Sequence, residues 1–104
     1  MTQAYIVAEV DVADPEAYST YTAQVPACLA PFEGSFIVRA GAVTALRAGA
    51  VTALEGASPA GRIVILAFPS KAQAQAFWNS PAYRAIAPIR QGCSTARIFM
   101  VEGN

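Results

Sequence analysis

The 104-residue chain contains no histidine, and this absence excludes more chemistry than any other feature of its composition. Ser-His-Asp triads, Cys-His pairs, His-ligated haem and the usual zinc sites all need an imidazole. The two cysteines, Cys28 and Cys93, are far apart and have no CxxC spacing. We expect both to be reduced and buried, with a disulfide or a reactive thiol as the alternatives, and we expect no metal or other cofactor.

Charge is also scarce. Charged residues make up 13% of the chain and hydrophobic residues 55%, whereas soluble domains usually have about 25% charged residues. Seven basic residues balance seven acidic ones without any basic run, which argues against nucleic acid and against an anionic membrane as partners. Because no segment has the pattern of a signal peptide or a membrane span, we expect a soluble, cytoplasmic protein. So few charges on so small a chain indicate an oligomer that buries apolar surface against a copy of itself.

The hydrophobic pattern predicts a single domain over residues 1–104. Alternating residues predict strands, and Pro15 and Pro81 stand where helices begin, each just after a capping residue. The helix that starts at Asp14 should continue to Glu33 with a kink at Pro26. The expected strands cover 4–12, 35–39, 62–68 and 96–101, and the expected helices cover 14–33, 71–79 and 80–92.

This order of strand, helix, strand, strand, helix, strand predicts an α+β fold of the ferredoxin-like βαββαβ type, with an antiparallel sheet and the helices on one face. The third strand is apolar at nearly every position, which is typical of a strand covered on both faces. Since helices cover only one face, the other face needs a partner. We expect the same face of a second copy, so that two sheets pair as a dimeric α/β barrel.

An eight-residue tandem repeat interrupts this pattern. AGAVTALR at 40–47 is followed at once by AGAVTALE at 48–55. Because eight is even, a shift by one repeat leaves every side chain on the same face of a sheet. We prefer an extended hairpin that continues the second strand through the first copy, turns near 48–49 and returns through 51–54. The alternative places one copy in the sheet and loops out the other.

Several segments together resemble the Domain of Unknown Function 1330 family of the dimeric α/β-barrel superfamily. They are AYIVAEVDVADPEAY, FIVRAG, IVILAFPSKAQAQAFWNSPAYRAIAPIR and RIFMVEG, and only residues 40–61 depart from the family pattern. The resemblance implies a dimeric ferredoxin-like fold and assigns no activity. Superfamily relatives include cofactor-free monooxygenases, muconolactone isomerase-like enzymes and haem proteins. The lack of histidine argues against the haem branch.

Three large side chains are candidates for holding a ligand between sheet and helices. Arg39 could bind a carboxylate or an enolate oxygen, or form a salt bridge to an acidic residue. Arg90 lies two helical turns after Tyr83 and could add positive charge to a pocket, or bind the carbonyls at the end of its own helix. Trp78 could stack on an aromatic ligand, or belong to the core or to an interface.

The NSPAY segment supplies further candidates. Asn79 and Ser80 lie at a helix junction, where they could contact a ligand or cap free backbone groups. Tyr83 could steady a phenolate, or bury its ring and bond its hydroxyl to the backbone. Tyr18, with Tyr5 and Tyr21, is expected to pack between helix and sheet with its hydroxyl lining any cavity that remains.

These residues support hypotheses of different classes. We favour a homodimer that pairs through the helix-free sheet face and binds a small organic ligand between sheet and helices. The alternative is a cofactor-independent oxygenase or isomerase that acts on a small aromatic or enolisable substrate, with Arg39 and Asn79 stabilising an oxyanion. A third hypothesis is partner recruitment by strand addition at the duplicated segment.

Overall fold

The computed structural model describes residues 3–41, 52–57 and 61–103. Four strands and four α-helices make up this part of the chain. The strands are β1 (Ala4–Val12), β2 (Ser35–Gly41), β3 (Arg62–Phe68) and β4 (Ser94–Glu102). The helices are α1 (Pro15–Thr22), α2 (Val25–Leu29), α3 (Lys71–Asn79) and α4 (Pro81–Cys93), with a short 3-10 helix, η1, at Ala30–Phe32.

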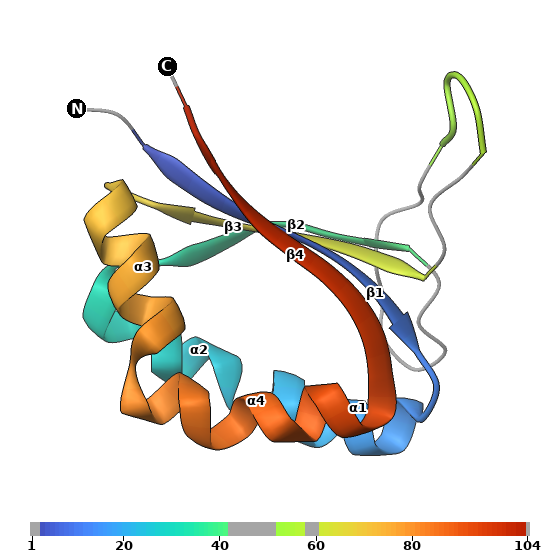
Figure 1. Cartoon of the computed structure of the whole chain (residues 1–104), viewed down its shortest axis with the longest axis horizontal. Helices are drawn as coiled ribbons and strands as arrows, with labels where there is room; N and C mark the ends of the chain where they lie inside the picture. Colours follow the sequence, from blue (N-terminus) through green and yellow to red (C-terminus); the bar gives the residue numbers. More distant parts are fainter. Residues whose placement is uncertain (1–2, 42–51, 58–60, 104) are drawn as a thin grey trace.

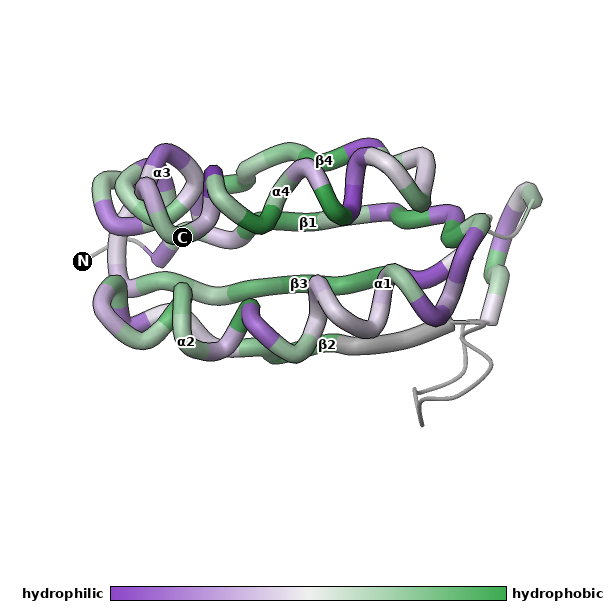
Figure 2. The backbone as a smooth tube through the Cα atoms, turned by 90° about the horizontal axis from the view of Figure 1, so that it is seen from below, coloured by the Kyte–Doolittle hydropathy of each residue, from purple (hydrophilic) through white to green (hydrophobic). Residues whose placement is uncertain are grey.

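The strands form one antiparallel sheet in the order β2-β3-β1-β4. The helices lie on a single face of this sheet (Figure 1). Seen from the helix side, α1 and α2 lie on the half that holds β2 and β3, and α3 and α4 lie on the half that holds β1 and β4 (Figure 2). The element order and the sheet topology confirm the predicted ferredoxin-like α+β fold.

The core fills the space between the sheet and the helices. Alternate residues of β1 and β3 face the helices, so Val10 and Phe68 are each 1% exposed while their neighbours in sequence are not buried. From the helix side, Phe77 of α3 is equally buried. Its ring lies 5.4 Å from that of Phe68, centroid to centroid. These rings join the two layers.

The first helical region differs from the predicted helix with a kink at Pro26. The chain breaks between α1, which ends at Thr22, and α2, which begins at Val25 and has Pro26 in its first turn. Proline has no N–H, and the first turn of a helix needs none, so Pro26 begins a second helix instead of bending the first. Asp14 caps α1 as predicted, accepting from the Ala17 N–H at 3.2 Å.

Most of the tandem repeat lies outside the described residues, so the hairpin through the first copy and the choice between its two placements stay predictions. The prediction that the chain returns as a strand through 51–54 is wrong for its last part, because residues 52–54 form no strand. Leu54 is 96% exposed, and Gly56 adopts a φ of 78° in the bend that follows. Because residues 52–57 are exposed, pairing of this segment with the sheet would bury no apolar side chain. Gly61, just before β3, lies close to the backbone of β1. A Cβ at this position would lie 2.1 Å from the Val10 carbonyl oxygen, so only glycine fits.

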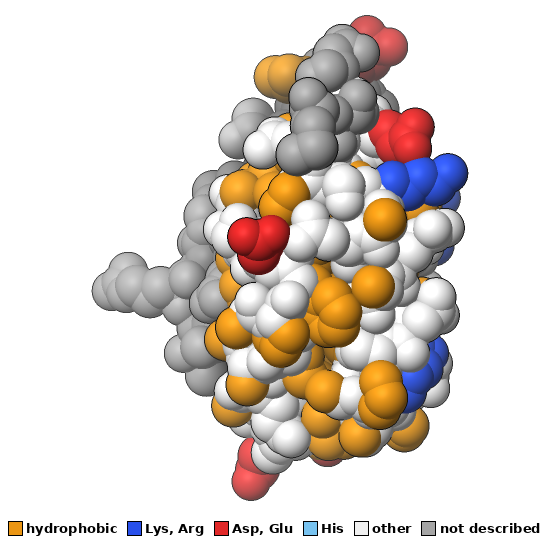
Figure 3. All heavy atoms as spheres, turned by 90° about the vertical axis from the view of Figure 1, so that its left-hand side faces the viewer, with side chains coloured by type: hydrophobic (Ala, Val, Ile, Leu, Met, Phe, Trp, Pro, Cys, Tyr) orange, Lys and Arg blue, Asp and Glu red, His pale blue; other side chains and the backbone are white. Residues whose placement is uncertain are grey.

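The sheet face opposite the helices carries an apolar row across all four strands. Val7 pairs with Phe99 on one side and with Ile65 on the other, and Ile65 pairs in turn with Val38. Phe99 is 47% exposed. Figure 3 views a different side of the molecule, the one at which both chain ends lie, and hydrophobic side chains predominate there over a few charged ones.

No helix among the described residues has the length and apolarity needed to cross a lipid bilayer.

Candidate functional site

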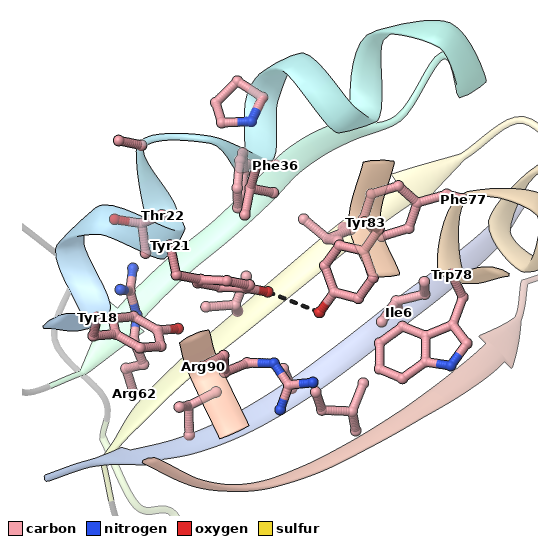
Figure 4. Close-up of a pocket in the computed structure, with 18 of the residues that line it drawn as sticks. Ile6, Tyr18, Tyr21, Thr22, Phe36, Arg62, Phe77, Trp78, Tyr83 and Arg90 are labelled. Atoms are coloured by element: carbon pink, nitrogen blue, oxygen red, sulfur yellow. Dashed lines mark hydrogen bonds between the residues drawn. The ribbon is translucent and has the colours of Figure 1, made fainter. Parts of the chain in front are cut away.

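A cavity of about 410 Å³ lies between the sheet and the helices. This volume is within the range of about 300–1,000 Å³ that is typical of small-molecule sites. Helix-facing residues of the strands form one wall, and side chains of the four α-helices form the others (Figure 4). The residues that carry the argument below are Tyr18, Tyr21, Arg62, Trp78, Tyr83 and Arg90.

Aromatic side chains dominate the walls. The Tyr21 and Tyr83 hydroxyls are joined by a hydrogen bond of 2.8 Å, drawn as a dashed line in Figure 4, in which either oxygen can donate. The Tyr18 ring lies 5.4 Å from that of Tyr21, and the Trp78 ring lies 5.2 Å from that of Tyr83. The pair of phenols has two hydroxyl hydrogens and uses one between its members. The second hydrogen is available to a ligand oxygen.

Burial sets the protonation of these phenols. It raises the pKa of Tyr21 far above its usual value, and the neighbouring Tyr83 adds to the rise. Burial also raises the pKa of Tyr18, although Arg62 and Arg90 act in the opposite direction. Both phenols are therefore neutral at physiological pH and act as hydrogen-bond donors, not as bases.

Two arginines enter the cavity from different elements. Arg62, the first residue of β3, is 3% exposed, and Arg90 of α4 is 6% exposed. The Arg62 guanidinium carbon lies 5.3 Å from the centre of the Tyr18 ring, and that of Arg90 lies 5.9 Å from the Tyr21 ring. Nε and Nη1 of Arg62 and Nε of Arg90 are buried without a hydrogen-bond partner. Buried cationic nitrogens without a hydrogen-bond partner are rare in protein interiors.

The structure brings four of the seven sequence-predicted residues together, places two of them elsewhere and does not describe the side chain of the seventh. Tyr18, Trp78, Tyr83 and Arg90 line the cavity. The buried Ser80 hydroxyl caps the helix junction, donating to the Phe77 carbonyl at 2.8 Å and accepting from the Tyr83 N–H at 3.2 Å. Asn79 is exposed and borders a smaller depression over β4. The Arg39 backbone pairs with Val64, and its side chain lies outside the described residues.

Sequence reasoning missed Arg62 as a site residue. A usable signal was present, because Arg62 shares the spacing of two with Val64 and Leu66, which predicts that it faces the helices like them. The same parity corrects the expectation for Tyr5, which lies on the helix-free face. Its hydroxyl donates to Oε1 of Gln3 at 2.8 Å instead of lining a cavity.

The remaining chemistry-bearing residues lie away from the cavity. Cys28 and Cys93 are buried and free, as predicted, and burial raises the pKa of each thiol. Glu9 pairs with Arg97 across the β1–β4 ladder, where the Arg97 Nε donates at 3.0 Å. Within the described part of the chain, no cluster of three carboxylate or thiol side chains is placed to hold a metal ion.

Comparison with protein families gives one match. The model of the domain of unknown function DUF1330 covers residues 3–104. The chain belongs to the DUF1330 family. A search of curated proteins finds no significant match for this DUF1330 chain.

Three solved structures with a similar fold are distant in sequence from this chain. SnoaB, described as a cofactor-independent oxygenase from Streptomyces nogalater, is 16% identical with a TM-score of 0.68, and the match covers 100% of this DUF1330 chain and 95% of SnoaB. A dimeric ferredoxin-like protein of unknown function from Thermobifida fusca is 16% identical with a TM-score of 0.58, over 96% and 92% of the two chains. RPA0582 of Rhodopseudomonas palustris, of unknown function, is 17% identical with a TM-score of 0.65, over 95% and 80%. These likenesses support the fold of the DUF1330 chain and carry no activity over to it.

Proposed function

We propose that this protein is a cytosolic homodimer that binds a small organic molecule with a flat apolar body in the cavity between sheet and helices. The cavity itself carries the proposal. Its volume of about 410 Å³ admits a ligand of one or two fused rings, and Trp78, Phe77 and the tyrosines offer ring faces for stacking. Hydrogen-bonding groups are few and converge from Tyr21, Tyr83 and the arginines, which is the arrangement typical of a ligand site.

Filling the cavity should abolish binding. Ala8 of β1 lines the cavity, and Ala8→Phe adds a ring to its wall. We expect the affinity for a bicyclic aromatic ligand such as naphthoate to fall at least about tenfold in isothermal titration calorimetry, because the new ring occupies the ligand's place. The melting temperature of the ligand-free variant should not fall, since the ring enters existing space.

The matched control is Ala72→Phe, which adds the same ring to the exposed side of α3. We expect this variant to bind like the wild type. Equal loss of binding in both variants would locate the ligand elsewhere, and wild-type affinity in Ala8→Phe would contradict binding in the cavity.

A second candidate function is oxidation of an electron-rich phenol by dioxygen without an added cofactor. The observation that favours it is the meeting of two hydrogen-bonded phenols and the Arg90 guanidinium beside apolar walls, which would stabilise a phenolate or an enolate. The fold shared with SnoaB supports it only by analogy. We expect an oxygen electrode to record dioxygen uptake with naphthol as substrate, and at least about a hundredfold less uptake with Arg90→Gln. No uptake by the wild-type protein across a panel of phenols would contradict this function and leave ligand binding intact.

A further inference from the structure

The positive charge in the cavity has no negative side-chain partner among the described residues. The chain has seven acidic residues, and all seven lie among the described residues. The salt bridges within this part of the chain join Arg97 to Glu9 and Lys71 to Glu102. Neither involves Arg62 or Arg90, so no side-chain carboxylate neutralises the two buried guanidinium groups.

The other cavity groups do not replace a carboxylate. Tyr18 and Tyr21 are neutral, because the ordinary pKa of a phenol is about 10 and burial raises it further in both. The tyrosine faces near the arginines give some cation–π stabilisation. The Tyr21 and Tyr83 hydroxyls also interact with Arg90, but they carry no charge and leave its Nε without a hydrogen-bond partner. A buried, unpaired charge costs more than such contacts return. In the ligand-free protein, both guanidinium groups therefore have buried N–H groups from which an anion could accept hydrogen bonds.

We propose that the ligand of this cavity is an organic carboxylate with a flat apolar body, whose carboxylate accepts hydrogen bonds from Arg90 and Arg62. This inference rests on the proposed function and names its ligand class. The carboxylate is held near the Tyr18–Tyr21 pair, because Arg62 lies over the Tyr18 ring and Arg90 lies between the Tyr21 and Trp78 rings (Figure 4). The free hydroxyl hydrogen of the Tyr21–Tyr83 pair donates to the same group.

The apolar body has its own place. Trp78, Phe77 and Ile6 line the part of the cavity away from Arg62, and none of them carries charge. An inorganic anion would accept hydrogen bonds from the arginines but would make no contact with these apolar walls. A neutral aromatic molecule would contact the walls but would not neutralise the arginines. A molecule that carries both a carboxylate and a ring contacts both parts of the cavity, which favours it over inorganic phosphate or sulfate.

A pair of isosteric probes tests the charge. Naphthoate and naphthamide have the same ring system and nearly the same shape, and they differ by the negative charge. We expect isothermal titration calorimetry on the wild-type protein to give at least a tenfold lower Kd for naphthoate, since a charge-assisted hydrogen bond is about twice as strong as a neutral one. Inorganic phosphate should not compete at equal concentration.

Arginine variants locate the effect. Arg62→Gln and Arg90→Gln should each weaken naphthoate binding at least about tenfold and leave naphthamide binding within about twofold, which removes the preference for charge. The matched control is Lys71→Gln at the start of α3, because Lys71 is exposed, pairs with Glu102 and does not line the cavity. This control should keep the full preference.

Each outcome decides between the proposals. Equal Kd values for the two probes in the wild-type protein would overturn the carboxylate inference and leave the proposed function standing. No binding of either probe, or of any aromatic acid or amide in a panel, would overturn the proposed function as well. If a glutamine variant does not fold, the wild-type pair still decides, and Arg90→Lys, which keeps the charge, should keep part of the preference.

A stability measurement separates a ligand site from a structural role. Arg62→Met replaces an unpaired buried guanidinium by an apolar side chain of similar length, so the ligand-free variant should melt a few degrees higher than the wild type. A melting temperature lowered by a similar amount would show that Arg62 stabilises the fold, and would count against its role as a ligand group.

Discussion

Replacing Phe77 by alanine is expected to lower the free energy of unfolding by about 3–5 kcal/mol. Phe77 of α3 is 1% exposed, and its ring contacts rings of both the helix layer and the sheet. Its ring lies 4.8 Å from Tyr83, 5.4 Å from Phe68 and 6.3 Å from Phe32, centroid to centroid. Removing the ring leaves a void that borders the ligand cavity, where the surrounding rings cannot close it because they are fixed by one another.

Urea denaturation at fixed protein concentration measures this loss, since the stability of a dimer depends on concentration. Phe77→Leu keeps much of the apolar volume and should cost clearly less. Leu54→Ala is the surface control, because Leu54 is 96% exposed, and it should change stability by less than about 0.5 kcal/mol. A loss below about 1 kcal/mol in Phe77→Ala would show that this cluster does not hold the layers together.

The strands and the later helices could be predicted because each has a local signal. The strand at 62–68 is apolar after Arg62 and is followed by Pro69, and Ser70 and Ser80 each provide a cap that the structure uses. The first helical region was harder, because an apolar stripe with a proline fits both a kinked helix and two helices. Contacts with the sheet and with α4 decide between them, and these are not local.

The site was harder to predict than the fold, for a physical reason. Tyr18 and Tyr83 are large enough to be expected in the interior from sequence alone, but their meeting with Arg62 depends on the packing of α1, α4 and β3. Arg62 was missed because a charged residue at the start of a strand is usually solvent-exposed. Its spacing with Val64 gives its direction, whereas its lack of a carboxylate partner emerges only in three dimensions.

The low proportion of charged residues has its structural counterpart in the helix-free face of the sheet. The row of Phe99, Val7, Ile65 and Val38 crosses the sheet without a charged residue, while Glu9 and Arg97 in the next row neutralise each other. A sheet covered on one face only is expected to expose polar residues on the other. This apolar row is the surface through which we propose that two copies of the chain pair.

Phe99→Asp should convert the proposed dimer to a monomer. Phe99 is 47% exposed in the single chain and stands in the apolar row, so in a two-fold dimer each substitution occurs twice at the interface. Burying an unpaired carboxylate costs several kcal/mol per copy, and the two copies together raise the dissociation constant by at least about ten-thousandfold. Light scattering should give twice the 10.9 kDa chain mass for the wild type and the single mass for the variant.

Ala72→Asp on the helix side is the matched control, since it adds the same charge to an exposed position at the start of α3. This variant should stay dimeric, because its carboxylate remains in water near a helix N-terminus. A wild-type protein that is monomeric at micromolar concentration would contradict pairing through the helix-free face, and a dimeric Phe99→Asp would place the interface elsewhere. Because the cavity lies on the opposite side of the sheet, monomeric Phe99→Asp should still bind naphthoate, which separates assembly from ligand binding.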